Sequence, residues 1–346
     1  MAGAGTNEGD TITRNSGRTE PAGGSAPATA RPEGEYRQLI NVAYRLLGSL
    51  AEAEDAVQEA FVRWYALPDR QRAAVEVPGA WLTTVVGRVC LDVLGSARAR
   101  RERYVGEWIP EPLPDTVEWL GGRAGDGGTD PADRIALDES VDMAFLVVLE
   151  AMTPAERVAF VLHDVFRYPF AELATIIGRS PAACRQLASS GRRRVGAARA
   201  PEPPTGVRAR VVKDFKQAWE AQDIAALVGL LTPDATVVVD GGGLVGAALR
   251  PITGAGEIAR YIVAINDMAP GTSLRLQPVN GRPGLVARRG DTVVTVAAFG
   301  LADGRITHIW AVRQGVPADE GLLDGVLRLR QGAQQPVGDI DQLPVL

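Results

Sequence analysis

The sequence predicts a multidomain protein in which two all-α domains, the second with a helix-turn-helix, precede an α+β domain. Three observations carry this prediction. Apolar residues recur at helical spacing through most of residues 36–195. Residues 168–195 have the pattern of two helices joined by a tight turn. After residue 207, helical patterns give way to alternating and β-branched runs that are split by Gly, Pro, Asn and Asp.

The composition of the 346-residue chain suits two or three domains. A net charge of −5 argues against a protein that coats nucleic acid indiscriminately, so DNA contacts must come from local basic patches. The two cysteines lie in separate helical patterns and are expected to be buried thiols, and two histidines without a Cys/His cluster argue against a metal site. No apolar run reaches the ~20 residues of a membrane span, and the N-terminus lacks a signal-peptide core. We expect a cytoplasmic protein with no membrane contact and no cofactor.

Changes in composition along the chain predict six segments. Residues 1–34 have almost no large apolar side chains and are expected to be disordered. Prolines and glycines mark a linker before the second helical domain, and a hinge after it. The expected segments are a tail (1–34), a first helical domain (35–106), the linker (107–132), a second helical domain (133–198), an α+β domain (207–315) and a C-terminal tail (316–346).

Three helices are expected in the first helical domain, starting near residues 36, 50 and 78. The second of them places Asp55, Gln58 and Glu59 off its apolar stripe. An acidic face of this kind is usually only solvated, but it also suits a basic partner surface. The third helix ends in a cluster that includes Arg98, Arg100 and Arg101, which fits either phosphate binding or a solubilising helix end.

Two helices should lead into the helix-turn-helix. Residues 130–133, Asp-Pro-Ala-Asp, are expected to cap a helix that runs through about Met152. Thr153 and Glu156 then have the spacing of a capping box for the next helix, which should end near Phe166.

In the helix-turn-helix, Pro169 can open the first helix, Gly178 suits a left-handed ending, and Ser180 can N-cap the second helix. The outer face of that second helix carries Arg185, Gln186, Ser189, Arg192 and Arg193. Residues early in such a helix can reach base edges in the major groove, and later ones can meet phosphates. The alternative is an ordinary αα-hairpin with a solvated basic face.

As an ordered set, segments 44–65, 78–106 and 153–188 resemble sigma-70 family transcription initiation factors of the extracytoplasmic-function type. The resemblance implies that Asp55, Gln58 and Glu59 dock on RNA polymerase core, at its β′ subunit. It implies that residues 67–103, with the arginine cluster, handle the downstream promoter element and strand opening. The residues implied to read the upstream element are Ala182, Arg185, Gln186, Ser189, Arg192 and Arg193.

The chain departs from that family pattern at two places. Val93 and Gly95 stand where a basic residue is usual, and Ser190-Gly191 stands where Arg-Ala is frequent. Both changes remove positive charge from expected DNA faces, so we expect a weak or unusual promoter preference.

The C-terminal third resembles the SnoaL-like fold, a cystatin-like half-barrel whose mouth often holds a small molecule. Some members are enzymes, and Asp240 and His308 are the available acid/base candidates. Three glycines after Asp240 indicate a tight turn instead, and His308 lies in a strand pattern with one face open. We therefore expect no enzyme and assign no catalytic residue, while a small-molecule ligand stays open. The alternative function is a DNA-binding repressor fused to a SnoaL-like ligand sensor or enzyme.

One subgroup of these sigma factors carries a fused SnoaL-like domain that is taken to regulate the factor in cis. The matching residues are Trp108, Pro110, Glu111, Pro112, Asp240, Gly241, Gly242, Gly243, Asn280, Gly281, Arg282 and Pro283. Residues 314–346 depart from the short terminus of that subgroup. Because Trp108 is a large apolar side chain in a linker, we expect the C-terminal domain to fold back and cover it.

Overall fold

The computed structural model describes residues 33–101, 108–114, 142–198, 203–241 and 250–313, and the statements below concern these residues. The side chains of residues 97–101 are not among the features described. Most of the expected N-terminal tail and linker, and the C-terminal tail from residue 316, lie outside the described part of the chain.

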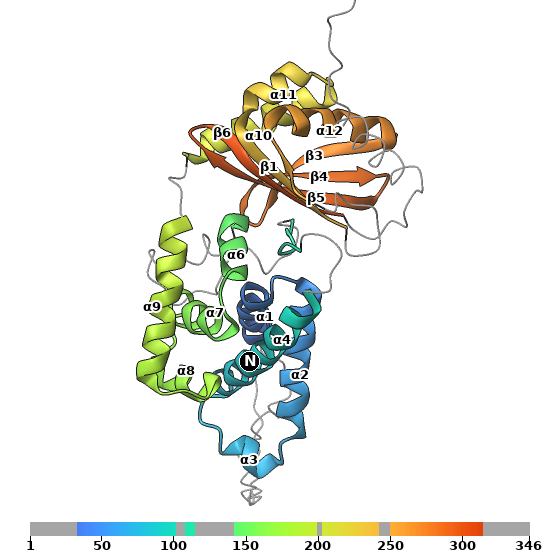
Figure 1. The fold of residues 1–346 in the computed structure, drawn as a ribbon. Coiled ribbons are helices and arrows are strands. Elements are labelled where there is room, and N and C mark those ends of the chain that lie inside the picture. The colour runs from blue at the N-terminus through green and yellow to red at the C-terminus, as the bar shows by residue number, and fades with distance from the viewer. Residues whose placement is uncertain (1–32, 102–107, 115–141, 199–202, 242–249, 314–346) are drawn as a thin grey trace, which may run out of the picture. The chain divides into compact units, whose positions relative to one another are not determined.

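The first helical domain has four helices in its described part (Figure 1). They are α1 (Glu33–Leu47), α2 (Leu50–Ala66), α3 (Asp69–Ala73) and α4 (Pro78–Arg101). The expected apolar stripes of α1 and α2 are buried, which confirms their helical phase. The rings of Trp64 and Trp81 lie 5.2 Å apart and join α2 to α4.

The described part of the second helical domain begins at Asp142. Asp142 has an extended backbone and accepts a hydrogen bond from Ala144 N, so it N-caps α6 (Met143–Glu150). One continuous helix from residue 133 to 152 was therefore wrong, and residues 133–141 lie outside the described ranges. Thr153 and Glu156 form the predicted capping box of α7 (Pro154–Phe160). A π-helical segment, η1 (Val161–Val165), continues it.

Two helices, α8 (Phe170–Ile177) and α9 (Pro181–Ala198), complete this domain and form the predicted helix-turn-helix. Gly178 ends α8 with φ +71°, a left-handed conformation that costs glycine little. The hydroxyl of Ser180 accepts a hydrogen bond from Ala183 N at 3.2 Å and caps α9. These two local signals were correctly predicted, whereas Pro169 is the N-cap of α8 and not its first residue.

The C-terminal domain is α+β, with its helices on one face of a six-stranded sheet (Figure 1). The helices are α10 (Thr205–Glu220), α11 (Ile224–Leu230) and α12 (Ala255–Met268). The strands are β1 (Leu231–Asp240), β2 (Ile252–Thr253), β3 (Thr272–Val279), β4 (Arg282–Arg289), β5 (Thr292–Ala302) and β6 (Arg305–Arg313). Their order is β2-β1-β6-β5-β4-β3, with β1 and β6 parallel and the other pairs antiparallel. This arrangement confirms the predicted fold class.

Successive side chains of the central strands serve two different cores, because they point to opposite faces of the sheet. On β5, Ala297 and Phe299 pack with the helices of the C-terminal domain. Their neighbours Val296 and Ala298 belong to the apolar cluster that includes α1, α2, α4 and the second helical domain. The sheet is therefore buried on both faces, and its second face contributes to the core of the helical domains.

Candidate functional site

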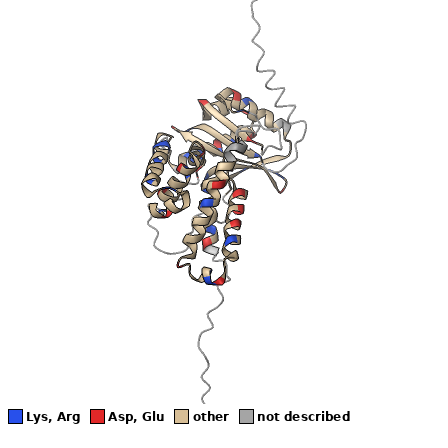
Figure 2. Ribbon diagram, turned by 60° about the horizontal axis from the view of Figure 1, so that its bottom comes forward, with Lys and Arg blue, Asp and Glu red and all other residues tan. Residues whose placement is uncertain are grey.

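The outer face of α9 is the candidate DNA-reading surface. Cys184, Ala188 and Gly191 are buried on the inner face, as the periodicity predicted. Ala182, Arg185 and Gln186 are exposed on the outer one. Figure 2 shows the basic positions along this helix.

The arginines of α9 differ in what they contact within the protein. The Arg185 guanidinium lies 5.5 Å from the centre of the Phe170 ring, a cation–π contact that leaves its donors available. Arg193 donates to the Ser189 hydroxyl at 3.3 Å.

Arg192, in contrast, is engaged by Asp164 of η1. It makes hydrogen bonds of 2.7 and 3.0 Å to the two carboxylate oxygens of that residue. A phosphate would have to compete with this ion pair, so Arg192 is a weaker candidate for DNA contact than Arg185.

Gly191 has a packing role. A Cβ at this position would lie 2.7 Å from the Phe160 Cβ, so only glycine allows α9 and α7 to approach this closely. Gly191 is buried, so the expected loss of positive charge in the Ser190-Gly191 pair concerns the half-buried Ser190.

The arginine cluster Arg98, Arg100 and Arg101 lies in the last turns of α4, and its side chains fall outside the described features. Earlier in α4, Arg88 donates to the Thr175 carbonyl of α8 at 2.9 Å. The end of α4 therefore stays a candidate on sequence grounds, while its middle is in contact with the helix-turn-helix.

The candidate polymerase-binding surface on α2 is acidic and also apolar. Asp55, Gln58 and Glu59 are all exposed, and Glu59 pairs with Arg63 at 2.8 Å. Sequence reasoning did not include Val62 and Tyr65, which are 58% and 43% exposed on the following turns. Positions 55, 58, 62 and 65 follow one another at helical spacing, so these exposed apolar side chains extend the acidic patch along one face. The signal that could have found them was an apolar residue off the buried stripe.

The described linker residues lie against the turn between α1 and α2. Glu111 N donates to the Gly48 carbonyl at 2.7 Å, and the Glu111 carboxylate accepts from Leu50 N at 3.0 Å. Leu50 is the first residue of α2, so a residue 61 positions away supplies a charged acceptor to a helix N-terminus. Burial raises the pKa of this carboxyl, although the hydrogen bond from Leu50 opposes the shift.

The β3–β4 turn meets the same linker from the other side. Asn280 and Gly281 have φ of +50° and +72°, as a two-residue hairpin turn requires. Leu113 N donates to Asn280 Oδ1 at 2.5 Å, and Asn280 N donates to the Leu113 carbonyl at 2.8 Å. Pro114 and Val279 extend this pairing as an antiparallel β-bridge.

Tyr44 joins these segments at one atom. Its ring is fully buried in α1, and its hydroxyl donates to the Glu111 carbonyl at 2.6 Å. The same oxygen accepts from Asn280 Nδ2 at 2.9 Å. Burial raises the pKa of Tyr44, which keeps the phenol protonated as the donor that this geometry needs. We call Tyr44, Glu111, Leu113 and Asn280 the junction.

Trp108 has a described contact in the first helical domain. Its ring lies against Gly48, where a Cβ would come within 3.0 Å of Trp108 Cη2, and Pro110 lies beside it. The expectation that the C-terminal domain covers Trp108 stays a prediction, and the described contact of the linker with Asn280 is made by Leu113. Gly242 and Gly243 lie outside the described ranges.

Other residues of the expected interdomain set have separate positions. Pro112 is buried in the linker, and Asp240 and Gly241 are buried at the end of β1. Arg282 forms an ion pair of 3.3 Å with Asp142, the N-cap of α6. Pro283 pairs with Pro278 across the β3–β4 hairpin.

The two helical domains also contact each other directly. Arg157 of α7 is 3% exposed, donates to the Leu46 carbonyl at the end of α1 at 3.0 Å, and pairs with Glu150 at 2.6 Å. The hydroxyls of Thr83 and Tyr168 lie 2.8 Å apart between α4 and the start of α8. These contacts join the two helical domains, which the resemblance assigns to two different promoter elements.

The two acid/base candidates are not brought together. Asp240 is 7% exposed at the end of β1, whereas His308 is exposed and stacks on Trp310 at 5.4 Å. Burial lowers the pKa of His308. Within the described ranges, no cluster of three or more His, Cys, Asp or Glu side chains could hold a metal ion, and no helix has the length and apolarity to span a membrane.

Comparison with known proteins gives the family. Residues 33–101 match the model of Sigma-70 region 2, and residues 142–195 match that of Sigma-70 region 4. The chain is 38% identical to the ECF RNA polymerase sigma factor SigJ of Mycobacterium tuberculosis over 80% of this chain and 88% of that protein. It is 34% identical to the probable ECF RNA polymerase sigma factor SigI of the same organism, over 83% and 93% of the two chains.

The structural comparison agrees with the sequence comparison. The crystal structure of M. tuberculosis SigJ superimposes with a TM-score of 0.61 at 33% identity, covering 85% of this chain and 97% of that one. The chain therefore belongs to the extracytoplasmic-function RNA polymerase sigma factors, proteins that bind RNA polymerase core and promoter DNA and are not enzymes.

Proposed function

We propose that this sigma factor binds the β′ subunit of the core polymerase through the outward face of α2 and reads the upstream promoter element with the outer face of α9. We further propose that its C-terminal domain regulates it in cis, by holding the two helical domains in a compact form that does not bind promoter DNA.

Exposure and chemistry support the polymerase-binding surface. A patch of exposed apolar side chains next to charged ones is typical of the surface that a protein partner buries. On α2, Val62 and Tyr65 would supply the apolar contact, and Asp55 and Glu59 the charge complementarity to a basic partner.

The contact between α4 and α8 supports the compact form. Residues 67–103 are the segment implied to handle the downstream promoter element, and α4 makes up most of it. A Cβ on Gly87 of α4 would lie 3.0 Å from the Ile176 side chain of α8, so the two helices approach closely there. DNA cannot occupy this face of α4 while α8 covers it.

The observation that carries in-cis regulation is the shared hydroxyl of Tyr44. One oxygen bonds the linker through Glu111 and the C-terminal domain through Asn280, while its ring belongs to the first helical domain. Buried hydrogen bonds of this kind cost ~1–3 kcal/mol each when a partner is left unsatisfied. The effective concentration within one chain favours such an interface even when it is weak.

A small molecule in the C-terminal domain could adjust this balance. The strands that line the inner face of that domain carry Val296 and Ala298 on their other face, in the core of the helical domains. A ligand that binds the compact and open forms with different affinity would shift their populations.

The test removes the Asn280 side chain without removing its turn. Asn280→Gly tolerates the φ of +50°, deletes the side-chain hydrogen bonds with Leu113 N and the Tyr44 hydroxyl, and keeps the backbone hydrogen bond to the Leu113 carbonyl. We expect a larger radius of gyration by X-ray scattering. We also expect run-off transcription with core polymerase to rise by about tenfold, because losing one to two kcal/mol of docking shifts the equilibrium by that factor.

The matched control is Asp303→Gly. Asp303 has φ +49° in the β5–β6 turn and is exposed, so this variant tests the turn substitution alone. If Asn280→Gly scatters and transcribes as the wild type does, the junction does not regulate the protein. Failure of the wild-type chain to co-purify with core polymerase would instead favour a repressor.

A further inference from the structure

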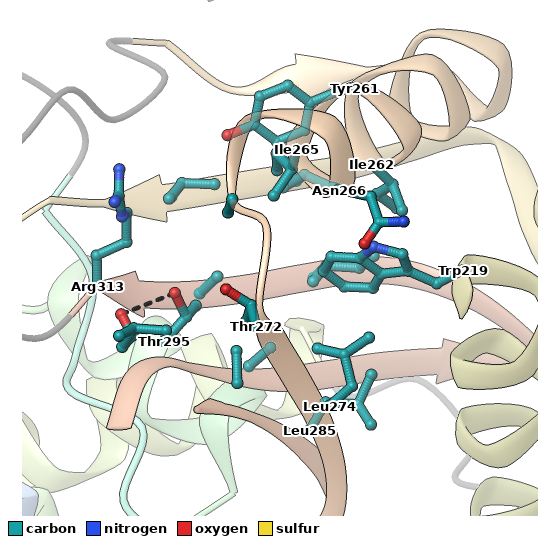
Figure 3. Close-up of a pocket in the computed structure, with 18 of the residues that line it drawn as sticks. Trp219, Tyr261, Ile262, Ile265, Asn266, Thr272, Leu274, Leu285, Thr295 and Arg313 are labelled. Atoms are coloured by element: carbon teal, nitrogen blue, oxygen red, sulfur yellow. Dashed lines mark hydrogen bonds between the residues drawn. The ribbon is translucent and has the colours of Figure 1, made fainter. Parts of the chain in front are cut away.

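The C-terminal domain contains a cavity of about 130 Å³ between α10, α12 and the inner face of the sheet (Figure 3). Most of its wall is apolar, and Phe215, Trp219, Ile262, Leu274 and Leu285 are among the largest contributors. An engineered protein cavity of about 150 Å³ holds one benzene molecule, so this volume suits an apolar body of about one ring.

The strand pairing brings polar side chains to one end of this cavity. Thr272 pairs with Arg289 across β3 and β4, and Thr295 pairs with Arg313 across β5 and β6. All four line the cavity. In Figure 3, Arg313 and Thr295 lie at one end with the Tyr261 hydroxyl turned toward them, whereas Trp219 lies at the other end. The cavity is therefore polar and basic at one end, whereas the other end is formed by Trp219 among apolar side chains, with the Asn266 carboxamide beside it (Figure 3).

The charge of the lining has one sign. Among the described residues that line the cavity, two are arginines and none is Asp, Glu or His. Burial lowers the pKa of Arg313 and the nearby Arg289 lowers it further, whereas Tyr261 opposes the shift. A negative charge placed at this end would favour the charged form of both guanidinium groups.

The Thr272 hydroxyl in the cavity wall can donate a hydrogen bond to a ligand. Thr272 Oγ1 is buried and has no hydrogen-bond partner among the described residues. A buried hydroxyl without a partner costs free energy, and a ligand oxygen placed near the arginines could accept its hydrogen bond.

We propose that this cavity binds an amphipathic organic monoanion, with a carboxylate or similar group at the Arg313 end and an apolar body of about one ring near Trp219. This proposal names the class of ligand for the proposed function. Ligand binding itself is argued from the cavity, and only its effect on transcription rests on the proposed in-cis regulation. Asp240 and His308 do not line the cavity, so the lining offers recognition of an anion and not carboxylate or imidazole acid/base chemistry.

The test uses the full chain, with 4-ethylbenzoate as the probe and 4-ethylbenzamide as its neutral counterpart. Calorimetry gives the affinities, and quenching of tryptophan emission reports on Trp219 in the wall. We expect saturable binding of 4-ethylbenzoate, at least tenfold tighter than that of the amide. An absence of saturable binding, or equal affinity for acid and amide, would overturn the proposal.

Variants locate the charge recognition. Arg313→Gln should weaken 4-ethylbenzoate binding at least tenfold and leave the amide unchanged, whereas Arg275→Gln, an exposed arginine of β3 outside the cavity, should alter neither. If Arg313→Gln does not fold, Arg289→Gln replaces it, and the same loss of 4-ethylbenzoate affinity with unchanged amide affinity is expected. Undiminished preference for the acid in the folded variant would contradict this site. Because ligand binding is measured without polymerase, an absence of ligand binding would not contradict the proposed binding of polymerase and promoter DNA.

Discussion

The junction and the outer face of α9 are both polar, but they are built in opposite ways. In the junction, a buried tyrosine, the linker backbone and a turn asparagine satisfy one another over sequence separations of 67 to 236 residues. On α9, Arg185 and Gln186 are exposed, and the arginine contacts only an aromatic ring of the neighbouring helix.

We therefore expect substitutions in the junction to lower the stability of the protein, and substitutions on the outer face of α9 to lower its affinity for DNA. Removing one member of the junction leaves buried partners unsatisfied, so the penalty appears in the protein itself. Removing an exposed arginine leaves water in its place, so the penalty appears only when DNA is present. The predictions below test this expectation, from the largest expected effect to the smallest.

Tyr44→Phe should have the largest effect on the protein itself. It keeps the ring but removes the hydrogen bond to the Glu111 carbonyl and the hydrogen bond that Asn280 Nδ2 donates to the hydroxyl. We expect a loss of about 2–4 kcal/mol from breaking two buried hydrogen bonds, seen in chemical unfolding, together with faster hydrogen exchange at Leu113. Tyr65→Phe, at an exposed position of α2, is the control and should change neither. If both variants are as stable as the wild type, the junction hydrogen bonds do not contribute measurably to the free energy of unfolding.

Arg185→Ala should have its effect on DNA alone. We expect a loss of about 1–3 kcal/mol in affinity for the upstream element and a relaxed base preference, if the guanidinium contacts a base edge. Arg193→Ala should instead weaken all sequences alike and flatten the dependence on salt. Fluorescence anisotropy with wild-type and scrambled duplexes at two salt concentrations distinguishes them. If both variants bind as the wild type does, another surface reads the promoter.

The α9 face could be predicted from sequence because its information is local. Gly178, Ser180 and the helical period fix the turn, the cap and the outward positions within about twenty residues. The capping box at Thr153 and the fold class were predictable for the same reason. Val62 and Tyr65 were missed because a binding surface can place apolar residues outside the buried stripe.

For the junction, the sequence predicted which segments take part but not how they contact one another. Periodicity and composition identify the linker and the β3–β4 turn, but they carry no information on which atoms meet. Thus the sequence did not indicate that Trp108 lies against Gly48 of the first helical domain. The Asn-Gly hairpin signal at residues 280–281 was available in the sequence, yet the partner of the asparagine side chain lies 236 positions earlier.

The smallest expected effect concerns the charge in the junction. Burial raises the pKa of Glu111, so the folded protein holds this proton to higher pH than the unfolded chain does. The stability that Glu111 contributes is therefore complete below the ordinary glutamate pKa and is lost as pH rises through the raised value. Glu111→Gln removes the charge and keeps an oxygen that can accept from Leu50 N.

We expect Glu111→Gln to match the wild-type melting temperature near pH 4 and to exceed it by about 1–2 °C near pH 7. Glu76→Gln, at an exposed position, should follow the wild type at both pH values. If Glu111→Gln is instead less stable than the wild type at pH 7, the charged carboxylate stabilises the folded protein, contrary to this prediction. The negative charge at the α2 N-terminus would then outweigh the cost of its burial, and the junction would resemble the exposed α9 face in tolerating charge.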